Sequence, residues 1–245
     1  MGDSEWQRVA GFRVVMSWPQ TGCAPPPTTL VRLRARFAGL AGVVLIMAGI
    51  TAVTIAIGAQ VHAPRPSRAA AGALGPWGRG HGPRLRPSRP VLVDIPAIGV
   101  HSKLMHLGIN PDGTIQVPPL RTRAGEAAWY KYSATPGEIG TSVIEGHVDN
   151  YQGPAVFFRL GALIPGDRVD VTLDDGITAV FRVTGVRQYA KSRFPSKTIY
   201  GAAGYAALHL ITCGGAFDYS TGHYLSSTVV FASLTSSRRA HRPAG

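Results

Sequence analysis

The sequence has 245 residues, of which 45% are hydrophobic and 16% are charged, and it contains 30 glycines and 19 prolines. This length allows one well-buried domain with appendages, and the glycine and proline content favours short strands and turns over long helices. The formal net charge of +12 does not indicate a nucleic-acid-binding domain, because residues 89–236 carry 12 Lys or Arg against 11 Asp or Glu and the excess lies in the flanks.

A continuous apolar run lies near the N-terminus. Residues 37–58 are 22 residues without a charge, and at about 1.5 Å of helical rise per residue they extend about 33 Å, enough to cross a bilayer core. Arg32, Arg34 and Arg36 precede the run, and this modest bias favours a cytoplasmic N-terminus. We expect a cytoplasmic segment at 1–36 and a transmembrane signal anchor at 37–58. A cleaved signal peptide is the alternative, but its apolar region is usually shorter.

The chain contains two cysteines, Cys23 and Cys213. The expected span would place them on opposite sides of the membrane, so they would not form a disulfide. An unpaired thiol in an oxidising compartment is a liability unless it is buried or used in chemistry. Both alternatives stay open for Cys213 on these grounds, because free cysteine is among the most frequently buried residue types.

The rest of the chain divides into a linker, a domain and a tail. Residues 59–88 are rich in Pro, Gly, Ala and Arg and predict a linker. Residues 89–236 contain short β-type runs separated by turn signals, which predicts an all-β barrel or sandwich with short helices. Residues 237–245 are polar and basic, and we expect them to form a disordered tail.

Several elements can be assigned within the domain from alternation and turn residues. Strands are expected at 91–100, 114–119, 142–145, 206–213 and 227–234, a β-hairpin at 165–190 around Asp174-Asp175-Gly176, and weak helix signals at 154–160 and 198–206.

Two expected strands lead to residues that could carry out chemistry. His147 follows a short strand and Gly146, and Cys213 ends a strand and precedes Gly214-Gly215, which would let a substrate backbone approach closely. A thiol and an imidazole at neighbouring strand ends are the minimum equipment for acyl transfer through a thioester. The alternative is a purely structural His147. No histidine has a metal-ligand spacing with Cys213, so neither a metal nor another cofactor is implied.

Four segments resemble the sortases, the membrane-anchored cysteine transpeptidases of Gram-positive bacteria. They are IPAIGVHSKLMHLGINPDGTIQVPP at 95–119, SATPGEIGTSVIEGHVD at 133–149, AVFFRLGALIPGD at 155–167 and LHLITCGGAFD at 208–218. Their order and spacing across residues 90–235 are most similar to the class F type found in actinobacteria. The resemblance implies a closed eight-stranded sortase-type β-barrel, preceded here by one transmembrane helix.

The resemblance also implies a reaction and its participants. Cys213 would be the nucleophile that cleaves a sorting signal resembling LPxTG and forms a thioester, and His147 would be the general acid and base. Secreted surface proteins would supply the sorting signal, and an amine of a cell-wall precursor or a pilin would accept the acyl group. The domain would lie outside the cell on a single-pass anchor and need no cofactor. Asp149 would either orient the imidazole or cap a turn.

One feature of the family is missing. Sortases carry an arginine on the strand after the cysteine, but residues 214–237 contain neither Arg nor Lys, and Leu225 stands where a cation is expected. Arg193 and His223 are candidate substitutes. Loss of one oxyanion donor typically costs about 10²- to 10³-fold in rate, so the alternative function is a catalytically impaired, membrane-tethered barrel that binds peptides. A Cys-His peptidoglycan hydrolase is disfavoured, because its Ser-His-Gly-Cys pattern is absent.

Overall fold

The structure is a computed structural model that describes residues 62–76 and 83–239. The residues from His62 onward form one compact unit. Cys23, the expected span at 37–58 and the last residues of the expected tail lie outside the described residues. Within 62–76 and 83–239, no helix is both long enough and apolar enough to cross a membrane.

Short strands dominate the described ranges, as the turn-rich sequence predicts. The strands are β1 Pro90–Ile95, β2 Val100–Leu107, β3 Ala127–Tyr130, β4 Gly140–Glu145, β5 Asp149–Asn150, β6 Gly153–Pro154, β7 Arg168–Leu173, β8 Ile177–Ala190, β9 Ala206–Asp218 and β10 His223–Arg239. The helical elements are the short helix α2 Ser196–Tyr200 and the 3-10 turns η1 Ala69–Ala71, η2 Pro96–Ile98, η3 Leu160–Ala162 and η4 Lys191–Arg193.

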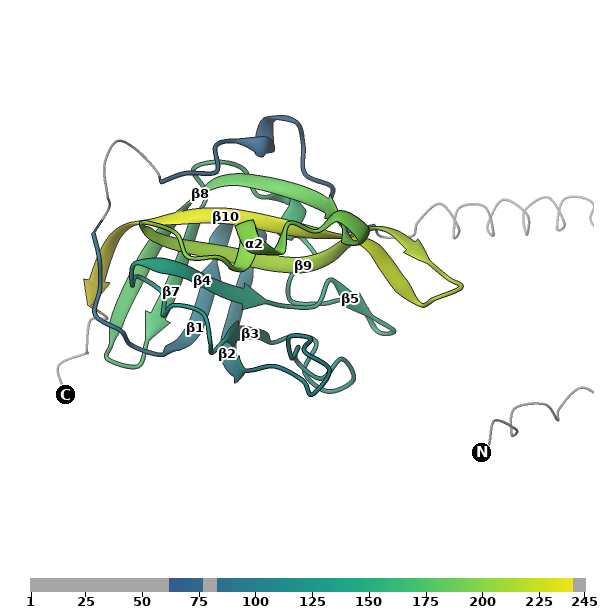
Figure 1. Cartoon of the computed structure of the whole chain (residues 1–245), viewed down its shortest axis with the longest axis horizontal. Coiled ribbons are helices and arrows are strands. Elements are labelled where there is room, and N and C mark those ends of the chain that lie inside the picture. The colour runs from purple at the N-terminus through teal and green to yellow at the C-terminus, as the bar shows by residue number, and fades with distance from the viewer. Residues whose placement is uncertain (1–61, 77–82, 240–245) are drawn as a thin grey trace, which may run out of the picture. The chain divides into compact units, whose positions relative to one another are not determined.

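Eight strands close into a barrel in the order β1-β2-β3-β4-β9-β10-β8-β7, and β5 and β6 form a separate two-stranded sheet (Figure 1). Neighbouring barrel strands are antiparallel, except that β2 pairs in parallel with β3 and β4 pairs in parallel with β9. This arrangement confirms the expected closed eight-stranded barrel. The parallel pair of β4 and β9 is important for the site. The two strands are distant in sequence, and parallel pairing sets their carboxyl ends side by side.

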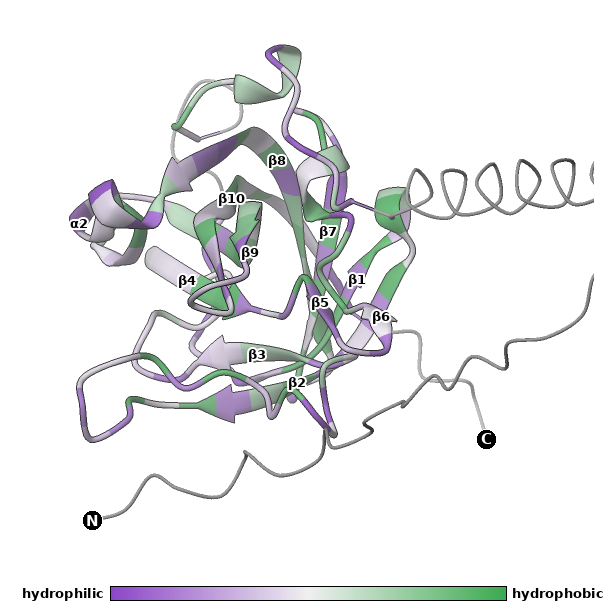
Figure 2. Cartoon of the chain, turned by 90° about the vertical axis from the view of Figure 1, so that its right-hand side faces the viewer, coloured by the Kyte–Doolittle hydropathy of each residue, from purple (hydrophilic) through white to green (hydrophobic). Residues whose placement is uncertain are grey.

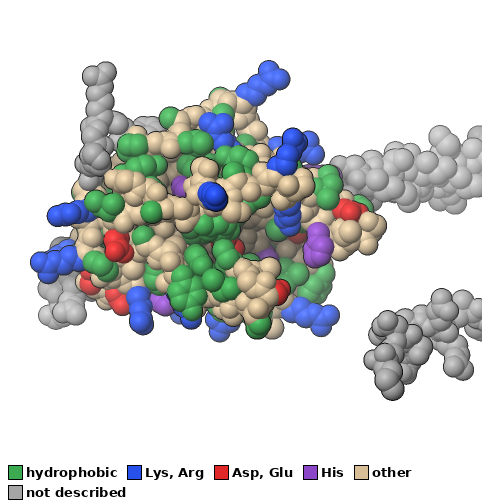
Figure 3. Space-filling model, in the orientation of Figure 1, with side chains coloured by type: hydrophobic (Ala, Val, Ile, Leu, Met, Phe, Trp, Pro, Cys, Tyr) green, Lys and Arg blue, Asp and Glu red, His purple; other side chains and the backbone are tan. Residues whose placement is uncertain are grey.

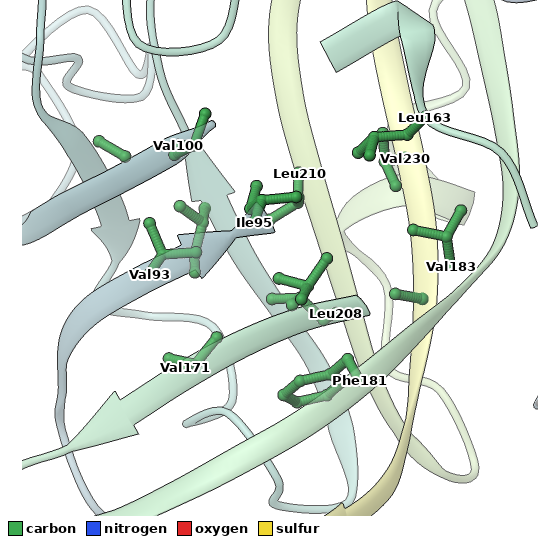
Figure 4. Close-up of a cluster of buried hydrophobic side chains, with 14 of the residues drawn as sticks. Val93, Ile95, Val100, Leu163, Val171, Phe181, Val183, Leu208, Leu210 and Val230 are labelled. Carbon is green, nitrogen blue, oxygen red and sulfur yellow. The ribbon is translucent and has the colours of Figure 1, made fainter. Parts of the chain in front are cut away.

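Aliphatic and aromatic side chains fill the barrel interior. Val93, Ile95, Phe181, Leu208 and Leu210 are completely buried and lie together in the interior (Figure 4). Along β2, buried residues alternate with exposed ones that face the other way, and Figure 2 shows the mixed hydropathy of the strands. Full burial of such a side chain is worth about 1.5–3 kcal/mol, so the interior is the main source of barrel stability.

A second set of apolar residues covers the opposite face of β4, β9 and β10. Its members, which we call the outer apolar cluster, are Val143, Ile199, Ile211, Val229 and Phe231, with Tyr130, Tyr189, Phe194 and Tyr200 packed at the margin. Ile199 belongs to α2, so this helix covers part of the face. These five residues are buried, and the space-filling view shows hydrophobic side chains interspersed with polar ones at the surface (Figure 3). Cys213 lies two residues past Ile211 and therefore shares its face.

The expected strand at 91–100 and the expected strand at 114–119 both differ in the structure. Pro96 begins the turn η2, which divides the first into β1 and β2, and Gly99 completes the turn with a φ of +68°. The second forms only an isolated bridge between Ile109 and Ile115. Prolines 118 and 119 have no N–H to donate, which explains why pairing does not extend further.

The helix signals were also only partly correct. The turn η3 at Leu160–Ala162 overlaps only the end of the signal at 154–160, and α2 ends at Tyr200 although the signal continued to 206. Gly201 caps α2 through its N–H, which donates to the carbonyl of Lys197 at 3.0 Å. A Cβ on Gly201 would lie 2.1 Å from that carbonyl oxygen, so only glycine fits this close approach.

The folded unit extends beyond the expected domain of 89–236 at both ends. Ala70 of η1 lies in the segment expected as linker, but it is only 1% exposed and belongs to the barrel interior cluster. Strand β10 continues to Arg239 and pairs there with Ile177 of β8, and Arg238 also donates to the buried carboxylate of Asp170 at 2.5 Å. Residues 237–239 are therefore strand and not part of a disordered tail.

Candidate active site

The parallel pairing of β4 and β9 ends just before His147 and Cys213. Glu145 and Ile211 form the last pair of the register, and the N–H of Gly146 donates to the carbonyl of Ile211 at 3.1 Å. His147 and Cys213 each lie two residues past that pair. The register therefore leads to both residues at the same end of the β4–β9 pair.

Cys213 is a free, partly exposed thiol. The sequence analysis expected it at the end of a strand, but β9 continues to Asp218 and pairs with β10 in a ribbon that projects beyond the barrel (Figure 1). The ribbon closes in a turn that Asp218 stabilises by accepting hydrogen bonds from Ser220 and Thr221. Cys213 thus lies in mid-strand opposite Ser227 of β10, which leaves its side chain accessible and fixes its backbone.

The two glycines after Cys213 have a structural reason. A Cβ on Gly214 would lie 2.8 Å from the hydroxyl of Thr228, and a Cβ on Gly215 would lie 2.8 Å from the hydroxyl of Ser226. Gly215 also has a φ of +80° and sits at a shift of register between β9 and β10, as is usual for a glycine at a β-bulge. Strand packing thus accounts for both glycines, without the substrate approach that the sequence analysis expected.

His147 is held by the segment that precedes β3. Its Nε2 lies 2.6 Å from the carbonyl oxygen of Pro118. Since a carbonyl oxygen can only accept a hydrogen bond, Nε2 carries the proton in this arrangement and Nδ1 of the neutral ring is free to accept one. The carbonyl can also stabilise the protonated ring. Pro118 therefore occupies the orienting position that a third polar group occupies in other nucleophile and base pairs.

Gly146 determines how closely the His147 segment approaches the barrel. A Cβ at this residue would lie 2.7 Å from Val156 and 2.8 Å from the ring of Phe157. The carbonyl of His147 in turn accepts a hydrogen bond from the N–H of Phe157 at 2.9 Å. The chain therefore needs glycine here to bring His147 against the 155–157 segment.

The register of β9 and β10 shows which residue of β10 lies opposite Cys213. Ser227 is the residue of β10 directly opposite Cys213, while Leu225 lies at the register shift and is 52% exposed. Arg193 is exposed in η4 and His223 is exposed at the start of β10. Within the described part of the chain, neither side chain makes a hydrogen bond or an ion pair. The structure thus gives no support to either candidate as a substitute.

A hydrogen bond that the sequence did not predict lies at the same site. The hydroxyl of Tyr224 in β10 donates to the carboxylate of Asp149 in β5. Burial raises the pKa of Tyr224, and the hydrogen bond to Asp149 and the charges of Asp149 and Cys213 raise it further. The hydroxyl therefore keeps its proton. Asp149 was expected either to orient the imidazole or to cap a turn, and neither role included Tyr224 as a partner.

A buried acid, also not predicted, lies beside the site. Glu145 at the end of β4 accepts a hydrogen bond from the hydroxyl of Tyr200 at 2.8 Å. Burial raises the pKa of Glu145 from 4.5 to about 7, although the hydrogen bond from Tyr200 opposes this shift. Because the carboxyl group lies at the margin of the outer apolar cluster, its ionisation is unfavourable.

Stability is therefore expected to depend on pH through Glu145. The raised pKa means that the folded protein binds this proton more tightly than the unfolded chain, so the free energy of unfolding falls as pH rises from about 4.5 to about 7. The loss attributable to this group is up to about 3 kcal/mol. Glu145→Gln should remove it while keeping an acceptor for Tyr200. Urea unfolding at pH 4.5 and pH 8 measures the difference.

Glu126→Gln is the matched control for this prediction, because Glu126 is an acid on the surface that pairs with Arg123 at 3.1 Å. It should leave the pH dependence of unfolding close to that of the wild type. Equal pH dependence in wild type and Glu145→Gln would contradict the assignment of a raised pKa to Glu145.

His209 of β9 has a structural role. Its Nδ1 lies 2.7 Å from the carbonyl of Ile199, and its ring packs edge-on against Phe231 at 4.7 Å. Burial lowers the pKa of His209 and keeps it neutral. Among residues 62–76 and 83–239, no cluster of three or more His, Cys, Asp or Glu side chains is arranged to hold a metal.

Comparisons with known proteins give a family and several similar structures. Residues 93–235, more than half of the chain, match the family model of the sortase domain. Sortase A of Listeria monocytogenes is 14% identical, with a TM-score of 0.47 over 64% of this chain and 93% of that one. A sortase of Actinomyces oris is 20% identical, with a TM-score of 0.46 over 65% and 87%. No curated protein matches the sequence.

Proposed function

Since the chain belongs to the sortase family, we propose that it is a cysteine transpeptidase that cleaves an LPxTG-like sorting signal and transfers the acyl part to an amine. The observation that supports this proposal is the parallel register of β4 and β9, which ends at Glu145 and Ile211, two residues before His147 and Cys213. A nucleophile and a base in adjacent positions are the equipment that acyl transfer through a covalent intermediate needs.

The first half of the reaction forms a thioester. The Cys213 sulfur attacks the carbonyl carbon of the scissile peptide bond, a C–S bond forms, and the tetrahedral intermediate collapses with cleavage of the C–N bond. The protonated His147 ring gives a proton to the departing amine. The hydrogen bond from Nε2 to Pro118 leaves Nδ1 as the nitrogen that exchanges protons with the substrate.

The second half transfers the acyl group. The neutral ring of His147 takes a proton from an incoming amine, which attacks the thioester carbon and releases the Cys213 thiolate. An amine of a cell-wall precursor or of a pilin is the proposed acceptor, and secreted surface proteins with a C-terminal sorting signal are the proposed substrates. No step in this sequence requires a cofactor.

The finer assignments rest on the sequence. The class F type is proposed from the order of the four segments, and an extracellular location on a single-pass anchor is proposed from the uncharged run at 37–58 and the arginines before it. The family match supports a membrane-anchored enzyme of the cell surface in general terms.

A second function is favoured by one observation. The residue opposite Cys213 is Ser227, and the chain has no Lys or Arg between residues 214 and 237. A sortase barrel without an oxyanion-stabilising cation could bind sorting signals and not cleave them. This alternative is a membrane-tethered peptide-binding module.

The two functions are distinguished by the acyl-enzyme. The full-length chain in detergent micelles is incubated with a fluorogenic LPxTG peptide, first without and then with triglycine or a lysine-containing acceptor peptide. The proposed function predicts a mass increase equal to the acyl fragment, located on Cys213 by peptide mapping, and an amide product when the acceptor is present. Peptide binding in a fluorescence polarisation assay with no adduct and no product would support the binding module and exclude the transpeptidase.

A further inference from the structure

The hydrogen bond between Tyr224 and Asp149 connects the two parts of the site. Tyr224 lies on β10, three residues before Ser227, in the ribbon that carries Cys213. Asp149 begins β5, two residues after His147. The bond therefore joins the segment that presents the imidazole to the ribbon that presents the thiol. These segments belong to different sheets, so no backbone ladder links Asp149 to Tyr224.

The His147 segment is otherwise held from the other side. The carbonyls of His147 and Val148 accept hydrogen bonds from Phe157 and Ala155, and the side chain of Asn150 donates to the carbonyl of Leu120 at 3.3 Å. Within the described residues, Tyr224 to Asp149 is the only side-chain hydrogen bond between residues 147–154 and the β9–β10 ribbon. Loss of this bond would leave His147 connected to the strand of Cys213 only through the backbone bond of Gly146 to Ile211.

The Tyr224 ring is itself fixed. It packs against Phe217 with ring centroids 5.0 Å apart at an angle of 70°, and Phe217 packs against Tyr219 at 5.1 Å. Such edge-to-face pairs are favourable and directional. The hydroxyl is therefore presented from a supported ring on the same ribbon as the nucleophile.

The charged groups that act on Tyr224 include both Asp149 and Cys213. Burial is the largest cause of the raised pKa of Tyr224, and the contributions of Asp149 and Cys213 act in the same direction. Because the phenol stays protonated, it donates to Asp149 throughout the pH range in which a thiol and an imidazole titrate. The carboxylate of Asp149 therefore stays hydrogen-bonded to Tyr224, and its negative charge stays in a fixed position.

We infer that Tyr224 and Asp149 are a pair of positioning residues, whose hydrogen bond holds His147 and Cys213 in the relative placement that acyl transfer needs. This inference rests on the proposed transpeptidase function. Neither residue exchanges a proton with the substrate. Their effect is on geometry, and misplacement of a catalytic group by about 1 Å can cost about 10²-fold in rate.

The test uses the full-length chain with Tyr224→Phe, which removes the donor and keeps the ring on Phe217. We expect kcat for acyl transfer to fall about 10- to 10²-fold with KM within about twofold. Asp149→Ala should have a similar effect, Asp149→Asn should be milder because the amide oxygen still accepts, and the double variant should be no worse than either single variant. Tyr219→Phe is the matched control, since Tyr219 is 83% exposed on the same ribbon, and it should match the wild type.

A readout that needs no substrate separates this inference from the proposed function. The rate of Cys213 alkylation by iodoacetamide is measured against pH, and the Tyr224→Phe profile should shift toward that of a His147→Ala chain at an unchanged melting temperature. If Tyr224→Phe matches Tyr219→Phe in both kcat and alkylation profile, the inference is wrong even where the wild type transfers peptide. If the wild type forms no acyl-enzyme but the profile still shifts, the pair stands and the transpeptidase proposal fails.

Discussion

Replacing His147 with alanine is expected to lower the rate of acyl transfer about 10²- to 10⁴-fold, the range typical for loss of a general acid and base. Without the imidazole, the departing amine has no proton donor and the incoming amine has no acceptor. The measurement is kcat/KM for the fluorogenic peptide with an amine acceptor across pH 5 to 10. The Cys213→Ala chain defines the floor of the assay, since it lacks the atom that is acylated.

Two comparisons separate this effect from a loss of structure. His147 also bonds to Pro118, so the melting temperature of the variant is measured, and free imidazole is added to the assay. Partial recovery of rate with imidazole indicates that the missing ring, and not a rearranged loop, limits turnover. His101→Ala is the matched control, because His101 is exposed on β2 and should leave the rate unchanged. A His147→Ala chain with the wild-type rate contradicts the proposed role.

Local patterns in the sequence predicted most of the barrel. The hairpin at 165–190 appeared as β7 and β8 around Asp174-Asp175-Gly176, because alternation and an Asp-Gly turn are local signals. Breaks in the pattern were harder to interpret. Pro96 divided one expected strand, and β10 continued along β8 into the expected tail, where Arg238 forms an ion pair with Asp170. That ion pair joins residues far apart in sequence, so no local pattern could indicate it.

The site shows the same division. His147 and Cys213 were visible in the sequence because a reactive side chain next to glycine is a local signal. The parallel register that ends just before both residues was not visible, since it depends on pairing between β4 and β9. Tyr224 with Asp149 and Tyr200 with Glu145 are contacts between distant segments. For Tyr200 and Glu145, the only indication in the sequence was the acidic residue at the end of the apolar run before Gly146.

The environment of the thiol also explains why charge composition alone could not indicate activity. The barrel region is nearly neutral, and its basic residues are distributed over the surface (Figure 3). The charged groups that act on Tyr224 beside Cys213 include the carboxylate of Asp149, whereas the residue opposite Cys213 is the neutral Ser227. The polar groups identified beside the thiol thus hold and orient the imidazole segment, but they supply no positive charge for an oxyanion.

Ser227→Arg is expected to raise kcat/KM about 10- to 10²-fold, somewhat less than the effect of removing a natural oxyanion donor. Directly opposite residues on antiparallel strands have Cβ atoms about 4.5–5.5 Å apart, so a guanidinium at 227 can reach a tetrahedral intermediate on the Cys213 sulfur. Ser227 is also opposite Tyr189 of β8, a half-buried aromatic residue on which a guanidinium can stack. The measurement is transfer of the LPxTG peptide by the full-length variant.

The register decides which position should accept the cation. Leu225→Arg places the same charge at the register shift, where the side chain is 52% exposed, and Ser227→Leu adds bulk at 227 without charge; neither should accelerate transfer. A larger gain from Leu225→Arg than from Ser227→Arg would mean that the bulge, and not the regular pair, faces the oxyanion. Equal rates for Ser227→Arg and Ser227→Leu would show that a cation is not what limits this site. A gain confined to Ser227→Arg would mean that the barrel already holds a competent thiol and imidazole and lacks only the positive charge.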